Sequence, residues 1–291
     1  MPLHPARRFR PACRLLLQAT VLLCTCGPAF GLDQVAVQLK WHHQFQFAGF
    51  YAAQDKGYYR EEGLEVALLE AQPGSDPVQA VLSGRARYGT GDSSLLLHRA
   101  AGQPVVVLAS IFQHSAAALV ARRTPDGKPI QWTGARVMLA TGDEELQAYL
   151  LRQGVKLADL KLLPHSQRLD DLIEGKVDAI SGYLTEVPYL LDRSGIRYEM
   201  LSPRAAGIDF YGDNLYTTEQ ELQEHPERAR AMREATLRGW RYAMAHPEEI
   251  VDLIRARYPQ GHSREHLMYE ARQTAKLMEQ PLVEPGYSNP A

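Results

Sequence analysis

Residues 34–57 read QVAVQLKWHHQFQFAGFYAAQDKG and set a pattern that most of the chain follows. Segment 34–39 is apolar and β-branched, which predicts a strand, and segment 47–56 predicts a helix that ends at Gly57. The loop at 41–47 holds three aromatic residues and two histidines. A strand followed by a helix is the unit of an α/β fold, and such folds bind ligands in the loops after the carboxyl ends of their strands.

The same alternation continues along the chain. Further strands are expected at 64–69, 87–89, 105–111, 136–140, 161–163, 178–180 and 209–216, and further helices at 76–82, 94–101, 143–153, 168–174, 226–245, 248–257 and 263–278. This order predicts an α/β protein with parallel sheets and helices on both faces. We expect two lobes, with residues 32–117 plus 207–291 in lobe 1 and residues 118–206 in lobe 2.

Residues 1–31 have the layout of a secretory signal peptide. Four arginines and no acidic residue precede an apolar run at 15–23, and Ala29 and Gly31 fit a small-x-small cleavage site. We expect cleavage near Gly31 and a periplasmic location; an uncleaved anchor and a lipid on Cys24 or Cys26 are the alternatives. The loop-like segment 287–291 also favours a shortened gene product, which would be membrane-tethered as part of a longer chain.

The composition excludes several classes of protein. Of the 291 residues, 45% are hydrophobic and 23% are charged, and the formal net charge is −2. These values exclude a disordered chain and a polytopic membrane protein, and they give no support for nucleic-acid binding. All three cysteines precede residue 31. The exported protein would therefore contain no disulfide, thiolate nucleophile, iron–sulfur cluster or cysteine zinc site.

Candidate ligand-binding residues of lobe 1 follow its predicted strands. Rings in the aromatic loop can form a wall against a planar ligand, with core packing as the alternative, and the candidates there are Trp41, Gln44 and Phe47. Segment 89–94, GTGDSS, lacks the third glycine of a dinucleotide-binding motif. It precedes a helix whose free N–H groups can contact a polar ligand, with a plain N-cap as the alternative, and the candidates are Gly91, Asp92 and Ser93.

The second lobe and the crossings between lobes supply the other candidates. Tyr183 and Glu186 follow the strand at 178–180, and Glu186 can accept hydrogen bonds from an amine or amidine; a surface glutamate at a helix start is the alternative. Tyr211 and Asp213 lie where the chain should re-enter lobe 1, and an acid-rich turn is the alternative. The remaining candidates are Gln113, His114 and Asp143.

Segment 262–266, HSREH, matches the H-x-x-E-H pattern of one class of zinc proteases. We interpret it as a solvated helix end, because Ser263 is a suitable N-cap and only roughly 25 residues follow to supply a third ligand. No motif for nucleophilic, phosphate-binding or paired-carboxylate chemistry stands out. The sequence therefore predicts no catalytic residue, no metal site and no cofactor.

The sequences of several segments resemble those of a known family. Segments 37–53 (VQLKWHHQFQFAGFYAA), 56–59 and 62–64, and then 84–89, 102–105, 111–115, 177–179 and 210–215, are similar to the thiamine-pyrimidine-synthase-like group of solute-binding proteins. That group is related to the alkanesulfonate-type periplasmic binding proteins. The resemblance covers nearly all of residues 32–291 and implies a two-lobed α/β Venus flytrap fold with the ligand between the lobes. It matches Trp41 to a tryptophan that walls the pocket of pyrimidine binders.

The chain departs from the enzymes of this group. The eukaryotic synthase uses a cysteine-rich iron motif, a lysine that carries pyridoxal phosphate and a pocket histidine, and Phe47 stands where that histidine would fall. Segment 185–188 reads TEVP where many sensory relatives read TNEP. The resemblance therefore implies a binding protein and not a pyrimidine synthase.

We predict an exported, non-enzymatic protein that closes its cleft on a small polar ligand. A thiamine-pyrimidine precursor is one candidate ligand; an amino acid, a polyamine and a sulfonate are others. The sequence around Trp41 also resembles the outer sensory regions of membrane signalling proteins, so we expect a fused transmembrane signalling module as partner. The substrate-binding component of an ABC uptake transporter, with an ABC permease as partner, is the alternative, and a thiamine-pyrimidine biosynthesis enzyme is the second alternative.

Overall fold

Two five-stranded sheets organise the protein. The structure is a computed structural model that describes Met1, residues 31–72 and residues 74–289. The three cysteines and the body of the predicted signal peptide lie outside the described residues. Leu32–Ala291 group into one unit, so the two sheets and the contacts between them can be described together.

The first sheet has the strand order β2-β1-β3-β10-β4. Its strands are β1 (Asp33–Gln38), β2 (Leu64–Leu69), β3 (Tyr88–Gly91), β4 (Val105–Phe112) and β10 (Gly212–Thr218). The strands β1, β2 and β3 are parallel, whereas β10 runs antiparallel to both β3 and β4. This sheet is therefore built from two segments of the chain that are about 100 residues apart.

The second sheet has the strand order β7-β6-β8-β5-β9 and comes from one continuous segment. Its strands are β5 (Ala117–Arg122), β6 (Arg136–Met138), β7 (Lys161–Leu163), β8 (Ala179–Tyr183) and β9 (Tyr198–Leu201). β6 is parallel to β7 and β8, and β5 is antiparallel to β8. The carboxyl ends of β6, β7 and β8 therefore lie at one edge, where an α/β sheet can offer ligand-binding loops.

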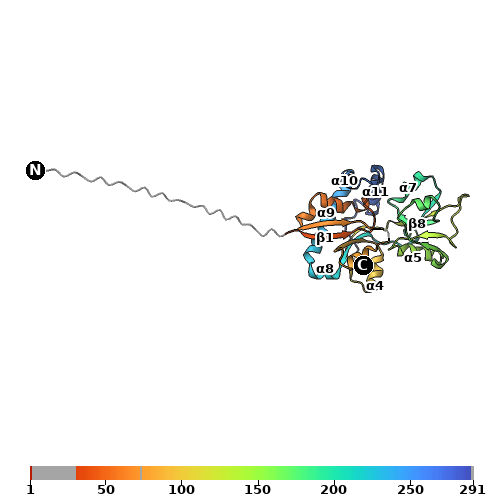
Figure 1. The fold of residues 1–291 in the computed structure, drawn as a ribbon, viewed down its shortest axis with the longest axis horizontal. Coiled ribbons are helices and arrows are strands. Elements are labelled where there is room, and N and C mark those ends of the chain that lie inside the picture. The colour runs from red at the N-terminus through yellow and green to blue at the C-terminus, as the bar shows by residue number, and fades with distance from the viewer. Residues whose placement is uncertain (2–30, 73, 290–291) are drawn as a thin grey trace. The chain divides into compact units, whose positions relative to one another are not determined.

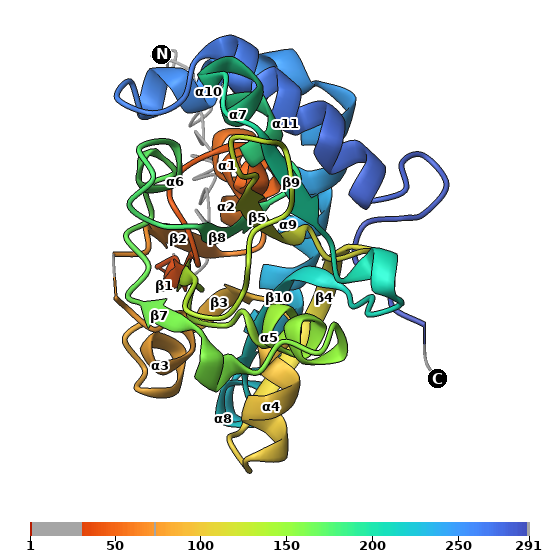
Figure 2. The ribbon, with the colours of Figure 1, turned by 90° about the vertical axis from the view of Figure 1, so that its right-hand side faces the viewer.

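Helices accompany each sheet. Those next to the first sheet in sequence are α1 (Ala48–Asp55), α2 (Tyr58–Glu61), α3 (Pro77–Leu82), α4 (Ser94–Ala100), α8 (Glu219–Glu224), α9 (Pro226–Ala245), α10 (Pro247–Arg257) and α11 (Arg264–Leu277). Those within the segment of the second sheet are α5 (Glu144–Arg152), α6 (Asp170–Ile173) and α7 (Val187–Ser194). Figure 1 shows the two groups of elements side by side, with α9 and β1 in one and α5 and β8 in the other, and Figure 2 shows them after a turn of 90°, where they overlap. In the described part of the chain, no helix is both long and apolar enough to cross a bilayer.

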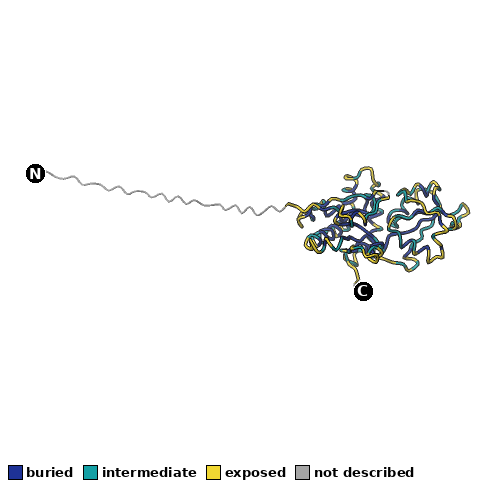
Figure 3. Tube along the Cα trace, turned by 60° about the horizontal axis from the view of Figure 1, so that its bottom comes forward, coloured by how far each residue is buried: buried dark blue, intermediate teal, exposed yellow. Residues whose placement is uncertain are grey.

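The core of the first lobe depends on a close contact between α1 and α9. The Trp240 side chain is fully buried and covers Gly49, where an added Cβ would lie 2.3 Å from the indole ring. A Cβ on Gly239 would lie 2.0 Å from the backbone oxygen of Gly49. The two helices can approach this closely only because both positions lack a side chain. The trace coloured by burial in Figure 3 shows the interior strands of both sheets as buried and the outer loops as exposed.

The two-lobed α/β fold predicted from the sequence is confirmed, with one difference in the sheets. Both sheets are mixed, because β10 and β5 run antiparallel to their neighbours. The sequence did not predict β5 or β9: β5 follows β4 without a helix between them, and β9 follows α7, a helix that was not predicted either. The residue limits proposed for the lobes stay a prediction.

Candidate functional site

A cavity of about 510 Å³ lies between the carboxyl ends of the two sets of parallel strands. Five of the residues predicted from the sequence line it: Trp41, Asp92, Asp143, Tyr183 and Glu186. The other lining residues include Lys40, Gln46, Thr141, His165, Gln167 and Ser181. Its volume is within the range of small-molecule sites, and both lobes contribute to its wall.

Lys40 is the centre of the charged part of this cavity. Its Nζ lies 3.1 Å from Asp92 Oδ2 and 3.1 Å from Asp213 Oδ1, and its side chain is only 11% exposed. Burial lowers the pKa of Lys40, but the carboxylates of Asp92 and Asp213 and the Tyr183 side chain outweigh it and raise that pKa well above its ordinary value. Burial also opposes ionisation of Asp92, yet Lys40 keeps the pKa of Asp92 below its usual value. The lysine is thus a charged group already balanced by protein carboxylates.

Asp213 reaches Lys40 from β10 through an unusual backbone conformation. Its φ angle is +48°, and its side chain is 3% exposed. The Tyr183 hydroxyl donates a hydrogen bond of 3.0 Å to Asp213 Oδ1, which joins β8 of the second sheet to β10 of the first. A left-handed conformation at a buried, non-glycine residue costs about 1–3 kcal/mol and persists only where its surroundings over-determine it. The contacts of Asp213 with Lys40 and Tyr183 hold its backbone in this conformation.

Trp41 and His165 form an aromatic wall from opposite lobes. Their ring centres lie 5.7 Å apart at an angle of 71°. The backbone N–H of Gln167 donates to His165 Nδ1 at 3.0 Å, and His165 Nε2 faces the Ser181 carbonyl at 3.3 Å, so the proton belongs on Nε2. Burial lowers the pKa of His165, which keeps the ring neutral at pH 7. This wall offers apolar ring surface rather than charge.

The second lobe contributes a half-buried carboxyl at Asp143. The backbone N–H of Ala140 donates to Asp143 Oδ2 at 2.6 Å and to the Ser181 hydroxyl at 3.0 Å. Burial raises the pKa of Asp143 to about 7, and the nearby Asp92 carboxylate also raises it. Asp143 can therefore exchange its proton for a hydrogen bond from a ligand near neutral pH.

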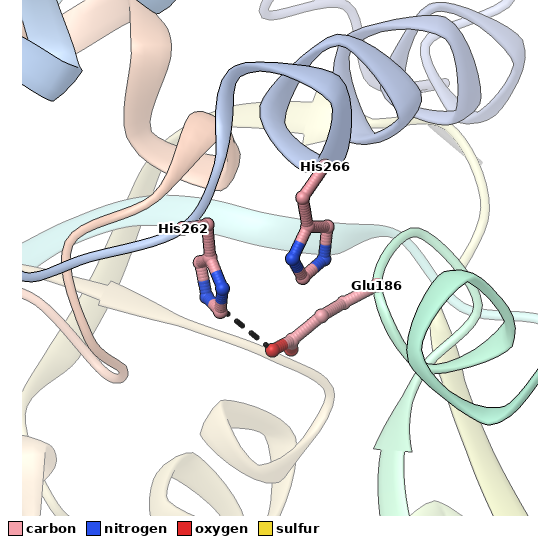
Figure 4. A group of neighbouring side chains, drawn as sticks. All are labelled: Glu186, His262 and His266. Carbon is pink, nitrogen blue, oxygen red and sulfur yellow. Dashed lines mark ion pairs between the residues drawn. The ribbon is translucent and has the colours of Figure 1, made fainter. Parts of the chain in front are cut away.

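Glu186 lies beside a pair of histidines, which changes the interpretation of segment 262–266. His262 Nε2 lies 3.5 Å from Glu186 Oε1, and Figure 4 shows both histidines facing this carboxylate. The His266 side chain is 2% exposed and stacks on Tyr189. The predicted solvated helix end is therefore only partly confirmed: Ser263 caps α11 and is exposed, as is Glu265, whereas His266 is buried.

Gly91 and Ser93 lie near the cavity without lining it. Gly91 is buried against Leu95, and the Ser93 hydroxyl donates to Glu145 Oε2 at 2.9 Å. Asp92 Oδ1 accepts a hydrogen bond of 3.0 Å from the backbone N–H of Ser94 at the start of α4. Ser93 is the N-cap of α4 but makes no capping bond with its side chain, whereas Asp92 both accepts from the first N–H of the helix and faces the cavity.

Five other predicted residues lie away from the cavity surface. Phe47 is fully buried in the core of the first lobe, and Gln44, 1% exposed, donates to Gln46. The remaining three contact the segment that follows α11: Gln113 donates to the Tyr287 carbonyl, Tyr211 accepts from the Asn289 N–H, and His114 lies 2.8 Å from Glu279. Asp213, whose contacts are described above, lies behind Lys40 and Tyr183.

Comparison with known proteins identifies the family. The family described as NMT1/THI5 like matches residues 44–250. The chain belongs to this NMT1/THI5-like family. The match begins inside the aromatic loop and ends within α10, so it includes most of the residues that line the cavity.

The NMT1/THI5-like chain is similar in sequence to two binding proteins and a synthase. The riboflavin-binding protein RibY of Chloroflexus aurantiacus is 27% identical over 76% of this chain and 66% of its own length, so the chain spans just under two thirds of it. The formylaminopyrimidine-binding protein of Halalkalibacterium halodurans is 26% identical over 82% and 76% of the two chains. The Saccharomyces cerevisiae 4-amino-5-hydroxymethyl-2-methylpyrimidine phosphate synthase THI13 is 25% identical over 74% and 68%.

A solved structure shows the same fold. The periplasmic aliphatic sulphonate-binding protein SsuA of Escherichia coli matches the NMT1/THI5-like chain with a TM-score of 0.62 at 16% identity, over 85% of this chain and 90% of its own. The fold is thus that of periplasmic binding proteins. The two binding proteins named above fit a non-enzymatic chain, as the sequence predicts.

Sequence reasoning missed several residues of the cavity. Lys40, Thr141 and His165 were not singled out, although each follows a strand by two or three residues. The rule that α/β proteins bind ligands after the carboxyl ends of their strands was the signal that could have found them. The sequence prediction included Asp143 after β6 but no residue after β7.

Proposed function

We propose that this protein binds a small, flat, nitrogen-rich molecule, such as an aminopyrimidine related to thiamine precursors, in the cavity between its lobes. The observation that carries the proposal is the combination of an aromatic wall with half-buried carboxyls in one cavity. Trp41 and His165 form the wall, and Asp92, Asp143 and Glu186 supply the carboxyls. Rings favour a planar ligand, and carboxyls favour one that presents N–H donors.

The charge of the cavity argues against a sulfonate or nitrate. Among the described residues that line the cavity, Lys40 is the only lysine or arginine, and two carboxylates already neutralise it. An anion would find no free cation here, and it would lie beside the Asp92 carboxylate and beside Asp143 and Glu186, whose pKa values burial raises to about 7. Like charges in a poorly hydrated site repel strongly, so a neutral or cationic ligand is favoured.

Closure of the cleft is the proposed mechanism. Contacts between elements of the two sheets already border the cavity: Tyr183 with Asp213, Trp41 with His165, and Ser93 with Glu145. A ligand held by residues of both lobes adds its binding energy to these contacts and stabilises the closed state. A partner protein then recognises the closed form.

The partner we propose is the permease of an ABC import system in a cell envelope, with the protein exported to the periplasm. The fold shared with a periplasmic binding protein supports this partner. The outer sensory region of a membrane signalling protein is the competing role, favoured by the wording around Trp41. Uptake of labelled ligand by cells that lack the protein separates them: lost uptake supports the transporter, and normal uptake with a lost signalling response supports the sensor.

Thermal unfolding with a ligand panel tests the binding proposal. The panel contains aminopyrimidines, riboflavin, amino acids, polyamines and sulfonates. A ligand at 100 times its Kd adds about 2.7 kcal/mol, which raises the melting temperature by roughly 5–10 °C for a protein of this size. We expect the shift with an aminopyrimidine. A shift with sulfonates alone would contradict the charge argument, and no shift with any compound would contradict the site.

A pair of variants tests whether the ligand binds at the aromatic wall. Trp41→Ala should abolish the shift because it removes one side of the ligand site, while Phe210→Ala removes an exposed ring that does not line the cavity and should leave the shift unchanged. Equal shifts in the two variants would show that the ligand binds elsewhere.

A further inference from the structure

Three side chains outside the aromatic wall converge on one point between the lobes. Glu186 precedes α7 of the second lobe, and His262 and His266 lie at the start of α11, which packs on the first lobe. One ligand atom from each of the three side chains lies within 4.8 Å of the other two. Figure 4 shows the two rings facing the carboxylate.

The interior side of this group holds polar atoms without partners. His266 Nε2 and Glu270 Oε1 lie 3.4 Å apart, yet neither has a hydrogen-bond partner among the described residues. The two side chains are only 2% and 1% exposed. A buried polar atom without a partner costs about 1–3 kcal/mol, so a nine-tenths buried pair in this state requires a reason.

The protonation states of the group suit a cation. Burial lowers the pKa of His266 to about 3 and that of His262 below its usual value, so both rings are neutral at pH 7 and offer lone pairs. Burial raises the pKa of Glu186 to about 7, and burial together with the nearby Glu186 raises the pKa of Glu270 well above its usual value. The other titratable or charged groups facing the histidines are His42 and Arg193, and Arg193 is engaged with Tyr189.

We propose that Glu186, His262 and His266 bind a divalent transition-metal ion of the zinc class and so join the two lobes. Two imidazoles and one carboxylate are the donor set of many three-residue zinc sites, and calcium or magnesium would require more oxygen ligands. Bonds of about 2.0–2.2 Å to zinc place ligand atoms roughly 3.5 Å from one another. The pair His262 Nε2 and Glu186 Oε1 already has that spacing, at 3.5 Å.

The metal would act on the proposed cleft closure, and this consequence rests on the proposed function. Glu186 also lines the cavity, so an ion bound to it would hold the edge of the second lobe against α11. The ligand-free protein would then be more closed with zinc than without it. Glu270, packed against His266 from the same helix, would orient the ring or neutralise the remaining charge.

Zinc titration of the purified full chain tests the site. The protein is first treated with a chelator, which is then removed, and zinc chloride is added in a calorimeter. We expect one zinc ion per chain, no comparable binding of magnesium or calcium, and an affinity that His262→Asn weakens by more than about tenfold. His225→Asn is the control, because His225 is an exposed histidine at the start of α9. Absent zinc binding in the wild type, or equal affinity in wild type and His262→Asn, would overturn the proposal.

Two further measurements keep the test independent of folding and of the proposed ligand. His262 is 26% exposed, so His262→Asn should melt like the wild type in the presence of a chelator. The absorption spectrum of the cobalt-substituted protein should show tetrahedral bands that His266→Gln removes; unaltered bands would exclude His266 as a ligand. The rise in melting temperature caused by an aminopyrimidine is also measured for His262→Asn in the presence of a chelator. A rise that remains there shows that the proposed ligand site works without the metal site, so failure of one proposal can be told from failure of the other.

Discussion

Lys40 shows how one residue can be structural and still belong to a binding site. Its ammonium group pairs with Asp92 and Asp213 at the edge of the cavity, and these two carboxylates neutralise its charge. A ligand therefore meets an already balanced cluster and not a free cation. The same balance means that removing the lysine leaves two buried carboxyls facing each other.

We predict that Lys40→Met destabilises the protein by about 3 kcal/mol, because an ion pair loses one partner in a poorly hydrated site. Urea unfolding at pH 7.5 measures the change. Lys56→Met is the matched control: Lys56 pairs with Asp55 and Glu249 at the surface and should cost less than about 1 kcal/mol. Equal losses in the two variants would contradict a buried Lys40 cluster.

Asp143 gives a prediction about pH. Its pKa is raised from 3.8 to about 7 by burial, so the folded protein keeps a proton that the unfolded chain releases. This group therefore contributes stability at low pH that is lost as the pH rises from 3.8 through 7. Asp143→Asn should stabilise the protein relative to wild type at pH 7.5, by on the order of 1 kcal/mol, and less at pH 5.

The comparison between variants matters because His266 has the opposite sign. Its pKa is lowered to about 3, so it costs stability as the pH falls below 6.5. The pH profile of the wild type alone mixes the two effects, whereas the difference between wild type and Asp143→Asn isolates the carboxyl. A difference that does not change between pH 5 and pH 7.5 would show that Asp143 is ionised throughout this range.

At the scale of elements, the contact between α1 and α9 sets the framework behind the cavity. We predict that Gly239→Ala destabilises the protein by about 3 kcal/mol, because the new Cβ would meet the Gly49 backbone oxygen, which cannot move without shifting α1. Urea unfolding measures it, with Arg230→Ala on the exposed face of α9 as control. A loss below about 0.5 kcal/mol would show that the two helices have room to separate.

The elements were also where sequence reasoning succeeded and failed. Long periodic segments such as α9 were predicted with their observed bounds, because a helix that packs along one face leaves a 3.6-residue pattern. β5 was taken as a crossing between lobes, since its alanine-rich strand lies between two antiparallel partners and leaves no alternation to detect. The charged cluster could not be foreseen either, because Lys40, Asp92 and Asp213 are far apart in sequence and meet only through the strand order.

At the scale of the whole molecule, Glu145 links the lobes beside the cavity. It accepts hydrogen bonds from Ser93 near the first sheet and from Ser115 at the crossing between the sheets. We predict that Glu145→Ala favours an open form and weakens ligand binding by about tenfold, since a hydrogen bond to a charged group contributes about 1.5–3 kcal/mol.

Small-angle scattering and ligand titration check this prediction. The radius of gyration of ligand-free Glu145→Ala should exceed that of the wild type, and saturating ligand should remove the difference. Glu144→Ala is the control for charge, because the neighbouring Glu144 Oε2 has no hydrogen-bond partner among the described residues. Identical scattering curves for the two variants would exclude Glu145 as a link between the lobes.

The position of β10 has a consequence for how the chain folds as it leaves the ribosome. β10 lies between β3 and β4, yet it is synthesised about 100 residues after them. Until that strand emerges, β3 has one unpaired edge and β4 has no strand partner at all, while every strand of the second sheet is already available. The later-built half of the molecule is therefore complete first, and the nascent first half must wait, with edges open to wrong partners or to chaperones, for a single late strand to join it.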